Sequence, residues 1–397
     1  MKLTPEQEKA LAKAKKWFDA CIPLESSVFR VFGYAGTGKT TLAQEFAKMV
    51  AGKVIFAAYT GKAAYVLRSK GCEGAGTIHS LIYLPKSKSA QRLRDLQKEY
   101  VKQADGDVSQ RILDSLQAEI AIEQENLKRP MFSLNASSPL DQASLLIVDE
   151  VSQVDQIVGE DLESFGIPIL VLGDDAQLPP VKGGGYFTNQ KPDVMLENIH
   201  RQAAGSRVLR IATQVREGRG LNAEDHIAKG VLDIADLAEF DQILVGTNKS
   251  RRVINTRMRE HLGYDDQLPV NGDRLICTRN DGETGLLNGS QWVVKDIFYD
   301  SNTDSLSMTI QSVEEPDTFL NVDAHPQPFR GEEIPYWSMR DSQCFEFAYA
   351  MTVHKSQGSQ FDTVCVIDES HRFPAHQRRS WLYTGITRAA KEVTIIR

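Results

Sequence analysis

Residues 33–40 read Gly-Tyr-Ala-Gly-Thr-Gly-Lys-Thr, a complete G-x-x-x-x-G-K-T phosphate loop. An apolar, β-branched run at 28–32 precedes the loop, and a helix-forming segment at 42–49 follows it. The motif requires this order of strand, loop and helix, because glycine backbones turn N–H groups toward phosphates at a helix N-terminus. Lys39 adds a charge between the β- and γ-phosphates, and the Thr40 hydroxyl can ligate Mg²⁺. The pattern predicts a nucleoside-triphosphate site rather than a chance glycine turn.

A carboxylate pair that could serve this site follows the apolar run at 145–148. Asp149 is placed to hold Mg²⁺, directly or through water, and Glu150 to orient the attacking water. An acidic turn that caps a buried strand is the alternative. The order of phosphate loop and then apolar run ending in Asp-Glu favours ATP hydrolysis.

The composition indicates an ordinary soluble globular chain with enough residues for two or three domains. Of its 397 residues, 41% are hydrophobic and 25% charged. No apolar run approaches the ~20 residues that span a bilayer, and residues 1–7 lack a signal-peptide pattern, so we expect a cytoplasmic protein. The five cysteines are scattered without a C-x-x-C pair, which fits a reducing compartment and argues against zinc.

The net charge of −7 excludes a surface that is basic throughout, the usual footprint of a protein coated in nucleic acid. A cleft lined locally with Lys and Arg remains compatible with this charge. The candidate cations for such a track are Lys62, Lys355, Lys249, Arg251 and Arg252.

The strand pattern predicts an α/β fold with two parallel sheets, divided near residues 190–200. Strand candidates of the first unit lie at 28–32, 54–58, 145–148 and 169–172, and those of the second at 242–245, 364–367 and 393–396. Residues 86–128 have helical spacing with a break at 105–107, which predicts an arm on the first unit. Strand patterns at 291–298 and 306–310 predict a small antiparallel sheet or barrel over about 271–344.

Four further segments narrow the function. They read Gly-Asp-Asp-Ala-Gln-Leu-Pro-Pro at 173–180, Asn-Ile-His-Arg-Gln at 198–202, Thr-Val-His-Lys-Ser-Gln-Gly-Ser-Gln-Phe-Asp at 352–362 and Tyr-Thr-Gly-Ile-Thr-Arg-Ala at 383–389. The first offers Gln177 as a γ-phosphate sensor. The second and fourth offer Arg201 and Arg388, whose guanidinium groups could stabilise the charge of the γ-phosphoryl transition state. Structural ion pairs are the alternative for both arginines.

In this order the segments resemble superfamily 1 helicases, most closely the 5′→3′ branch with RecD-like and Dda-like enzymes. The resemblance extends from residue 3 to residue 388. It implies two RecA-like P-loop NTPase units that bind ATP and Mg²⁺ between them. The implied metal ligands are Thr40 and Asp149. The implied catalytic residues are Lys39, Glu150, Gln177, Arg201 and Arg388. The implied ATP-binding residues, with Gln7 reading the adenine edge, are Gln7, Gly33, Gly36, Thr37, Gly38, Lys39, Thr40 and Thr41.

The resemblance also implies contacts to a single DNA strand through its phosphates, which carry no sequence information. The matching residues are Thr60, Lys62, Thr77, His79, Thr352, His354 and Lys355. A satisfied turn residue is the alternative for His79. Gln360 departs from the family, in which glutamate is common at this position, so a ribose or coupling role there stays open.

The implied domains are a first motor unit at 1–195 with an inserted arm or pin at 86–142, a second motor unit at 196–270 and 345–397, and a β-rich, SH3-like insertion at 271–344. Phe132 is a candidate wedge in the pin. The expected protein is a monomeric ATP-dependent DNA helicase, acting on single strands and on single-strand/duplex junctions with replication or recombination proteins, in a bacterial or phage-infected cell. An RNA or RNA–DNA translocase, and a nucleic-acid clamp or switch that does not unwind, are the alternatives.

Overall fold

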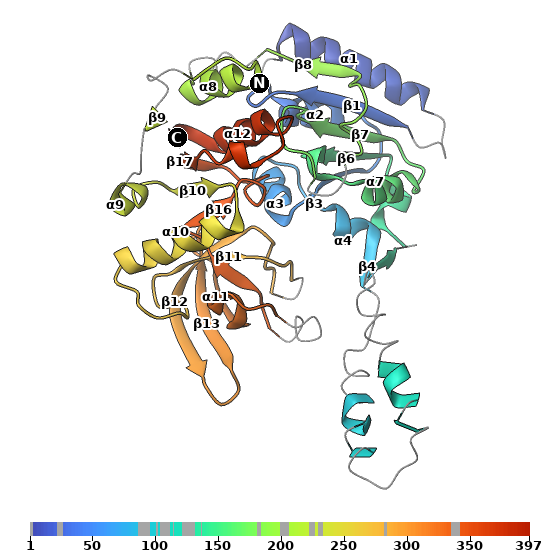
Figure 1. The fold of residues 1–397 in the computed structure, drawn as a ribbon. Helices are drawn as coiled ribbons and strands as arrows, with labels where there is room; N and C mark the ends of the chain where they lie inside the picture. Colours follow the sequence, from blue (N-terminus) through green and yellow to red (C-terminus); the bar gives the residue numbers. More distant parts are fainter. Residues whose placement is uncertain are drawn as a thin grey trace.

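The computed structural model describes residues 3–21, 27–85, 96–100, 102–103, 112–113, 115–120, 132–135, 137–180, 184–198, 206–221, 227–228, 233–281, 284–334 and 342–397. Two parallel sheets and one antiparallel sheet organise these residues (Figure 1). The predicted α/β class with two parallel sheets is confirmed. Among the described residues, no helix has the length and apolar character needed to cross a membrane.

The first unit contains a six-stranded parallel sheet in the order β3-β2-β6-β7-β1-β8. Its strands β6 and β7 are almost wholly apolar because helices cover both faces of the sheet. The strands are β1 (Val28–Gly33), β2 (Val54–Ala58), β3 (Gly76–Thr77), β6 (Leu145–Asp149), β7 (Ile169–Gly173) and β8 (Val194–Leu196). The helices are α1 (Pro5–Ala20), α2 (Lys39–Ala47), α3 (Gly61–Ser69), α4 (Ile78–Ile82) and α7 (Gln156–Glu163).

Three central strands of this sheet determine where the predicted ATP-site segments lie. β7 pairs with β1 on one side and with β6 on the other, all parallel. Their carboxyl ends therefore lie at the same edge, which is where open α/β sheets bind ligands. The phosphate loop follows β1, the turn 173–177 follows β7, and Asp149 ends β6.

The second unit is a five-stranded parallel sheet in the order β16-β10-β17-β18-β9. All seven predicted strands of the two parallel sheets are confirmed, two with the expected bounds and the others within four residues of them. The strands of this sheet are β9 (Ile227–Ala228), β10 (Gln242–Val245), β16 (Ala350–Thr352), β17 (Phe361–Ile367) and β18 (Ala389–Ile396). The helices are α8 (Arg207–Arg216), α9 (Ile234–Leu237), α10 (Asn248–His261) and α12 (Arg378–Ile386).

An antiparallel sheet in the order β14-β13-β12-β11-β15 is inserted into the second unit. On β13 the side chains of Leu306, Met308 and Ile310 are buried in alternation, as expected for a sheet with one covered face. Its last strand lies just past the suggested boundary at 344. The elements are β11 (Arg274–Cys277), β12 (Gln291–Asp300), β13 (Ser305–Ser312), β14 (Phe319–Ala324), α11 (Gln327–Arg330) and β15 (Phe345–Phe347).

A short hairpin of β4 (Tyr83–Pro85) and β5 (Phe132–Leu134) stands at the base of the predicted arm. The candidate wedge Phe132 lies on β5. Most of the arm, including the predicted break at 105–107, falls outside the described residues, whereas the described pieces at 96–100 and 115–120 are helical.

Candidate functional site

The phosphate loop is shaped by two glycines with left-handed backbones. Gly36 has φ 80° and Gly38 has φ 79°, values that side-chain-bearing residues rarely adopt. Gly38 precedes α2, so the loop amides gather at the N-terminus of that helix. The Lys39 ammonium lies over the loop, where Nζ donates to Gly33 O at 2.6 Å and to Tyr34 O at 3.3 Å.

Gln7 supports this loop from the first helix. Its side chain is 1% exposed, Nε2 donates to Thr37 O at 3.1 Å, and Oε1 accepts from Thr4 N–H at 2.9 Å. In this structure both ends of the amide are therefore engaged within the chain. Each end of the amide keeps a second hydrogen-bonding position, so adenine recognition by Gln7 stays a prediction.

Thr40 and Asp149 form the predicted metal-binding pair. The Thr40 hydroxyl donates to Asp149 Oδ2 at 3.0 Å. Burial, reinforced by the charge of Glu150, raises the pKa of the Asp149 carboxyl, while the Lys39 charge opposes that rise. One carboxylate and one hydroxyl fit Mg²⁺, which commonly takes few protein ligands and completes its shell with phosphates and water.

Glu150 follows Asp149 in an unusual backbone conformation. Its φ of 55° and ψ of 43° are left-handed, and only Asp304 shares a positive φ among the described non-glycine residues. The Glu150 N–H donates to Asp149 Oδ1 at 2.8 Å. Such strain costs of order 1–3 kcal/mol and clusters at functional sites, where it directs a side chain.

Gln177 and Arg388 line the same cleft from opposite units. Gln177 is 7% exposed, and its Oε1 has no hydrogen-bond partner within the described part of the chain. The Arg388 guanidinium, in a residue 5% exposed, donates to Ser359 O, Thr384 O and the Thr387 hydroxyl. No carboxylate among the described residues pairs with Arg388. A buried cation without a counter-ion is costly and does not fit the ion-pair alternative.

A cleft of about 700 Å³ collects these groups. It brings together the predicted residues Gly36, Gly38, Lys39, Thr40, Thr41, Asp149, Glu150, Gln177 and Arg388. Gly33 and Thr37 belong to the phosphate loop but do not line this cleft, nor does Gln7, and Arg201 lies outside the described residues. Gln44, Lys70 and Gln360 also line the cleft. Gln44 on α2 and Lys70 at the end of α3 were missed, because a Gln or Lys at such a place carries no motif signal.

The two units are in direct contact beside the cleft. Leu178 N–H donates to Thr384 Oγ1 at 2.9 Å, and Gln357 Nε2 donates to Leu178 O at 3.0 Å. Gly358, with φ 78°, packs so closely on α3 that an added Cβ would lie 3.0 Å from Ala63 Cβ. The turn after β7 is thus bonded to the second unit.

A second, smaller cavity of about 290 Å³ lies where the two units and the antiparallel sheet meet. It brings together four predicted DNA contacts, Thr60, Lys62, His354 and Lys355. Residues that were not predicted also line it, including Tyr59, Gln153, Thr278 and Asn288.

The remaining predicted DNA contacts lie around this cavity without lining it. Thr77 caps α4 by accepting from Ser80 N–H at 3.1 Å, and Thr352 accepts from Lys355 N–H at 3.3 Å. The His79 ring lies 5.7 Å from the Tyr59 ring. Burial lowers the pKa of both His79 and His354, so neither is a strong candidate for a charged phosphate contact near neutral pH.

Both predicted DNA-contact lysines are paired with carboxylates from the antiparallel sheet. Lys62, 9% exposed, forms an ion pair with Glu314, which follows β13, and Lys355 forms one with Glu346 on β15. Burial acts to raise the pKa of Glu346, but the charges of Lys355 and Arg251 hold it below its ordinary value. In this conformation both lysines are therefore engaged within the chain, and their contact with DNA stays a prediction.

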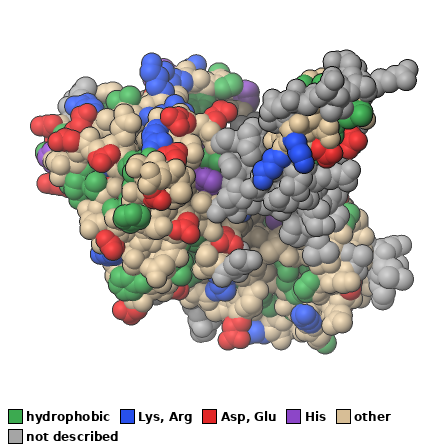
Figure 2. Space-filling view, turned by 90° about the horizontal axis from the view of Figure 1, so that it is seen from below, with side chains coloured by type: hydrophobic (Ala, Val, Ile, Leu, Met, Phe, Trp, Pro, Cys, Tyr) green, Lys and Arg blue, Asp and Glu red, His purple; other side chains and the backbone are tan. Residues whose placement is uncertain are grey.

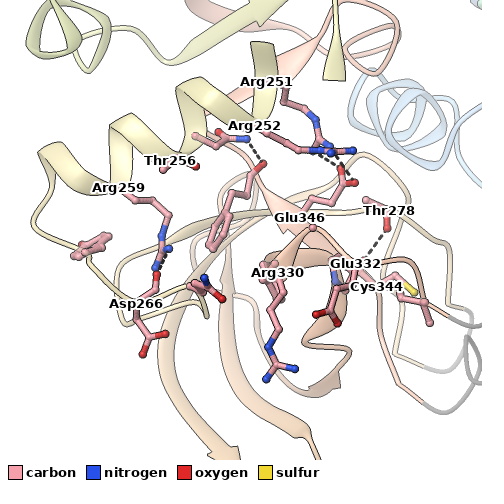
Figure 3. Close-up of a pocket in the computed structure, with 18 of the residues that line it drawn as sticks. Arg251, Arg252, Thr256, Arg259, Asp266, Thr278, Arg330, Glu332, Cys344 and Glu346 are labelled. Atoms are coloured by element: carbon pink, nitrogen blue, oxygen red, sulfur yellow. Dashed lines mark hydrogen bonds and ion pairs between the residues drawn. The ribbon is translucent and has the colours of Figure 1, made fainter. Parts of the chain in front are cut away.

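Arg251, another candidate for the basic track, is also paired with a carboxylate. It is 7% exposed and donates to Glu346 at 2.5 and 3.3 Å (Figure 3). With the exposed Arg252 it lines a separate cavity of about 940 Å³ between α10 and the antiparallel sheet. Acidic side chains share this cavity, and Figure 2 shows Lys and Arg interspersed with Asp and Glu on the visible face.

Two family models match this chain, one over its first part and one over its last part. Residues 3–236, more than half of the 397, match the model described as an AAA domain. Residues 347–396 match the model of a UvrD-like helicase C-terminal domain.

The chain is also similar to individual helicases. The ATP-dependent RecD2 DNA helicase of Deinococcus radiodurans is 25% identical over 279 residues, which cover 62% of this chain and 35% of that protein. The ATP-dependent DNA helicase Pif1 of Campylobacter jejuni is 24% identical over 312 residues, covering 63% of this chain and 68% of that protein. The chain thus spans about a third of the RecD2 helicase and two thirds of the Pif1 helicase.

A solved structure shares the fold over the full length. Pif1 helicase from Bacteroides in complex with ADP-AlF3 and ssDNA matches with a TM-score of 0.56 at 19% identity, over 100% of this chain and 92% of that chain. The phosphate loop, the Asp-Glu pair and the two parallel sheets agree with this assignment. The chain belongs to the family described as an AAA domain, and the two models together with the two relatives assign it to the RecD/Pif1 branch of the superfamily 1 helicases.

Proposed function

We propose that this chain is an ATP-dependent DNA helicase that moves 5′→3′ along single-stranded DNA and unwinds duplex ahead of it. The observation that carries the proposal is the 700 Å³ cleft, in which Lys39, Asp149 and Glu150 of the first unit face Arg388 of the second. Hydrolysis at such a site can open and close the interface between the units. The names of the RecD2 and Pif1 relatives, both ATP-dependent DNA helicases, support the same activity.

The chemistry follows from the groups in the cleft. The loop amides and Lys39 bind the phosphates, and Glu150 accepts a proton from the water that attacks the γ-phosphorus. Gln177 contacts the γ-phosphate, and Arg388 stabilises the charge on the γ-phosphoryl oxygens. Mg²⁺, held by Thr40 and Asp149, would neutralise the charge of the β- and γ-phosphates.

The DNA path proposed here runs through the cavity between the two units and the antiparallel sheet. Lys62, Thr60, His354 and Lys355 come from both units, so a strand lying there would be held by two bodies that move relative to each other. Contacts to phosphate suit a motor that must cross any base sequence. The Bacteroides Pif1 complex contains ssDNA, which supports this ligand class.

We also propose the division into two RecA-like units, an arm or pin at 86–142 and an SH3-like insertion from 271 to 347. The extension to 347 follows from β15, which pairs with β11. The pin would split the duplex as the units pull on one strand.

Duplexes that carry only a 5′ tail or only a 3′ tail test the function. With ATP and Mg²⁺, we expect unwinding of the 5′-tailed duplex alone, and none by the Lys39→Ala variant. Unwinding of only the 3′-tailed duplex would contradict the polarity. ATP hydrolysis stimulated by single strands without strand separation would support a clamp or switch, and a requirement for an RNA tail would support an RNA translocase.

A further inference from the structure

The hydroxyl of Tyr383 joins three elements that surround the proposed ATP site. Tyr383 lies on α12 of the second unit and is 1% exposed. Its hydroxyl accepts from Ala35 N–H of the phosphate loop at 3.1 Å and donates to Asp174 Oδ2 at 2.7 Å. One phenol thereby contacts the loop after β1 and the turn after β7 from the opposite unit.

Asp174 in turn shapes the turn that carries Gln177. Its Oδ1 accepts from Ala176 N–H at 3.1 Å, and its carbonyl accepts from Gln177 N–H at 3.2 Å. Asp174 is 2% exposed, and burial raises the pKa of its carboxyl, although the Lys39 charge opposes the rise. A buried carboxylate depends strongly on its donors, and Tyr383 is the side-chain donor to Oδ2.

The same segment of the second unit carries Arg388. The next residue after Tyr383 is Thr384, whose hydroxyl accepts from Leu178 N–H and whose carbonyl accepts from the Arg388 guanidinium. Arg216 adds a further contact between the units, with its guanidinium carbon 3.4 Å from the centre of the Tyr34 ring. The position of Arg388 in the cleft is therefore linked to the turn and loop that Tyr383 holds.

We propose that Tyr383 is a positioning residue for ATP hydrolysis. Its two hydrogen bonds hold the phosphate loop and the Gln177 turn against α12, so that Gln177 and Arg388 reach the γ-phosphate together. The hydroxyl contributes to turnover rather than to nucleotide affinity, because the loop amides and Lys39, which bind the phosphates in the ground state, belong to the first unit, whereas Arg388 acts in the transition state. Tyr383 touches neither substrate nor metal in this role.

Tyr383→Phe tests the proposal, since it removes the hydroxyl and keeps the ring. At saturating single-stranded DNA we expect kcat for ATP to fall by ~10–100-fold, the range that a displacement of about 1 Å produces, while KM for ATP stays within about threefold. Tyr349→Phe is the matched control. Tyr349 is also buried and donates to a carboxylate, Asp273 Oδ1, at 2.8 Å, but it lies outside the ATP cleft.

The two phenylalanine variants separate positioning from folding. Both lose one buried Tyr–Asp hydrogen bond, so we expect similar decreases in Tm, whereas only Tyr383→Phe loses kcat. Equal kcat values for the two variants and the parent would overturn the proposal.

A second variant serves if Tyr383→Phe does not fold. Thr384→Val removes the hydroxyl that accepts from Leu178 N–H on the same helix, and we expect it to lower kcat without changing KM for ATP. Parental kcat in Thr384→Val would then overturn it.

A double-variant cycle tests the route through Asp174. Asp174→Asn keeps an acceptor oxygen but weakens the hydrogen bond by removing the charge. If Tyr383 acts through this residue, the double variant loses less kcat than the product of the two single losses. Fully multiplicative losses would overturn that route.

Discussion

At the scale of the single residue, Glu150 combines the predicted chemistry with a strained backbone. A left-handed conformation brings Cβ close to the following carbonyl oxygen. This close contact raises the free energy of the folded state. The side chain of Glu150 lines the cleft beside Asp149. We interpret the strain as the means by which two consecutive carboxylates reach one site.

Glu150→Gly and Glu150→Ala should therefore differ in stability but not in activity. Both remove the carboxylate, so ATP hydrolysis should fall by orders of magnitude in each. Glycine also removes the Cβ clash, and we expect its free energy of unfolding to exceed that of the alanine variant by about 1 kcal/mol. Urea unfolding of both variants measures this difference. If Glu150→Ala were more stable than Glu150→Gly, the backbone at position 150 would not be strained.

Replacement of Arg388 tests whether the second unit contributes to ATP hydrolysis in the cleft. Arg388→Ala should lose turnover by ~10³ or more and keep nucleotide affinity within about tenfold, because an arginine finger acts in the transition state. Steady-state ATPase rates and binding of a fluorescent nucleotide measure the two effects. Loss of stability with intact turnover would instead indicate a structural cation.

At the scale of elements, the antiparallel sheet supplies the counter-ions of both predicted DNA-contact lysines. Glu314 reaches Lys62 on α3, and Glu346 reaches Lys355 beyond β16. A DNA phosphate entering this cavity would compete with both carboxylates for the same ammonium groups. The sheet is thus placed to influence how easily a strand is bound.

Glu314→Gln should tighten the binding of single-stranded DNA roughly two- to fivefold, the effect of releasing about 0.5–1 kcal/mol of ion pairing. Asp317→Asn is the matched control, because it removes the same charge from the same loop and has an exposed side chain. Fluorescence anisotropy with a labelled oligonucleotide measures both. Equal affinities for the two variants would show that Glu314 does not compete with DNA, provided that Lys62→Ala weakens binding.

At the scale of the whole molecule, an acidic chain must hold DNA through a local set of cations. If a few phosphates are neutralised, the logarithm of affinity should fall with the logarithm of salt at a slope of roughly −0.7 per contact. Lys62→Ala should reduce the magnitude of that slope by about one contact and weaken all mixed sequences equally. Titrations at several salt concentrations measure it. A strong sequence preference would mean that bases are read.

Much of the fold was predictable from local patterns. The apolar runs at 145–148 and 169–172 are strands because parallel strands covered on both faces need continuous hydrophobic side chains. The phosphate loop was predictable because its glycines, lysine and threonine are adjacent in the chain. Lys39, Asp149 and Gln177 follow three predicted parallel strands whose carboxyl ends share one edge of a sheet, so their approach to one another was predictable, whereas the tertiary structure decided the strand order.

The sequence by itself predicted the elements, the family and the candidate ATP-site residues, because short motifs of neighbouring residues, in a fixed order along the chain, carry that information. Only the tertiary structure decided the partners of these groups. Lys62 and Glu314 lie 252 positions apart, and Tyr383 and Asp174 lie 209 apart. Their hydrogen bonds and ion pairs leave no local pattern, because such contacts arise only when separate sheets pack together and exclude water from the charges between them.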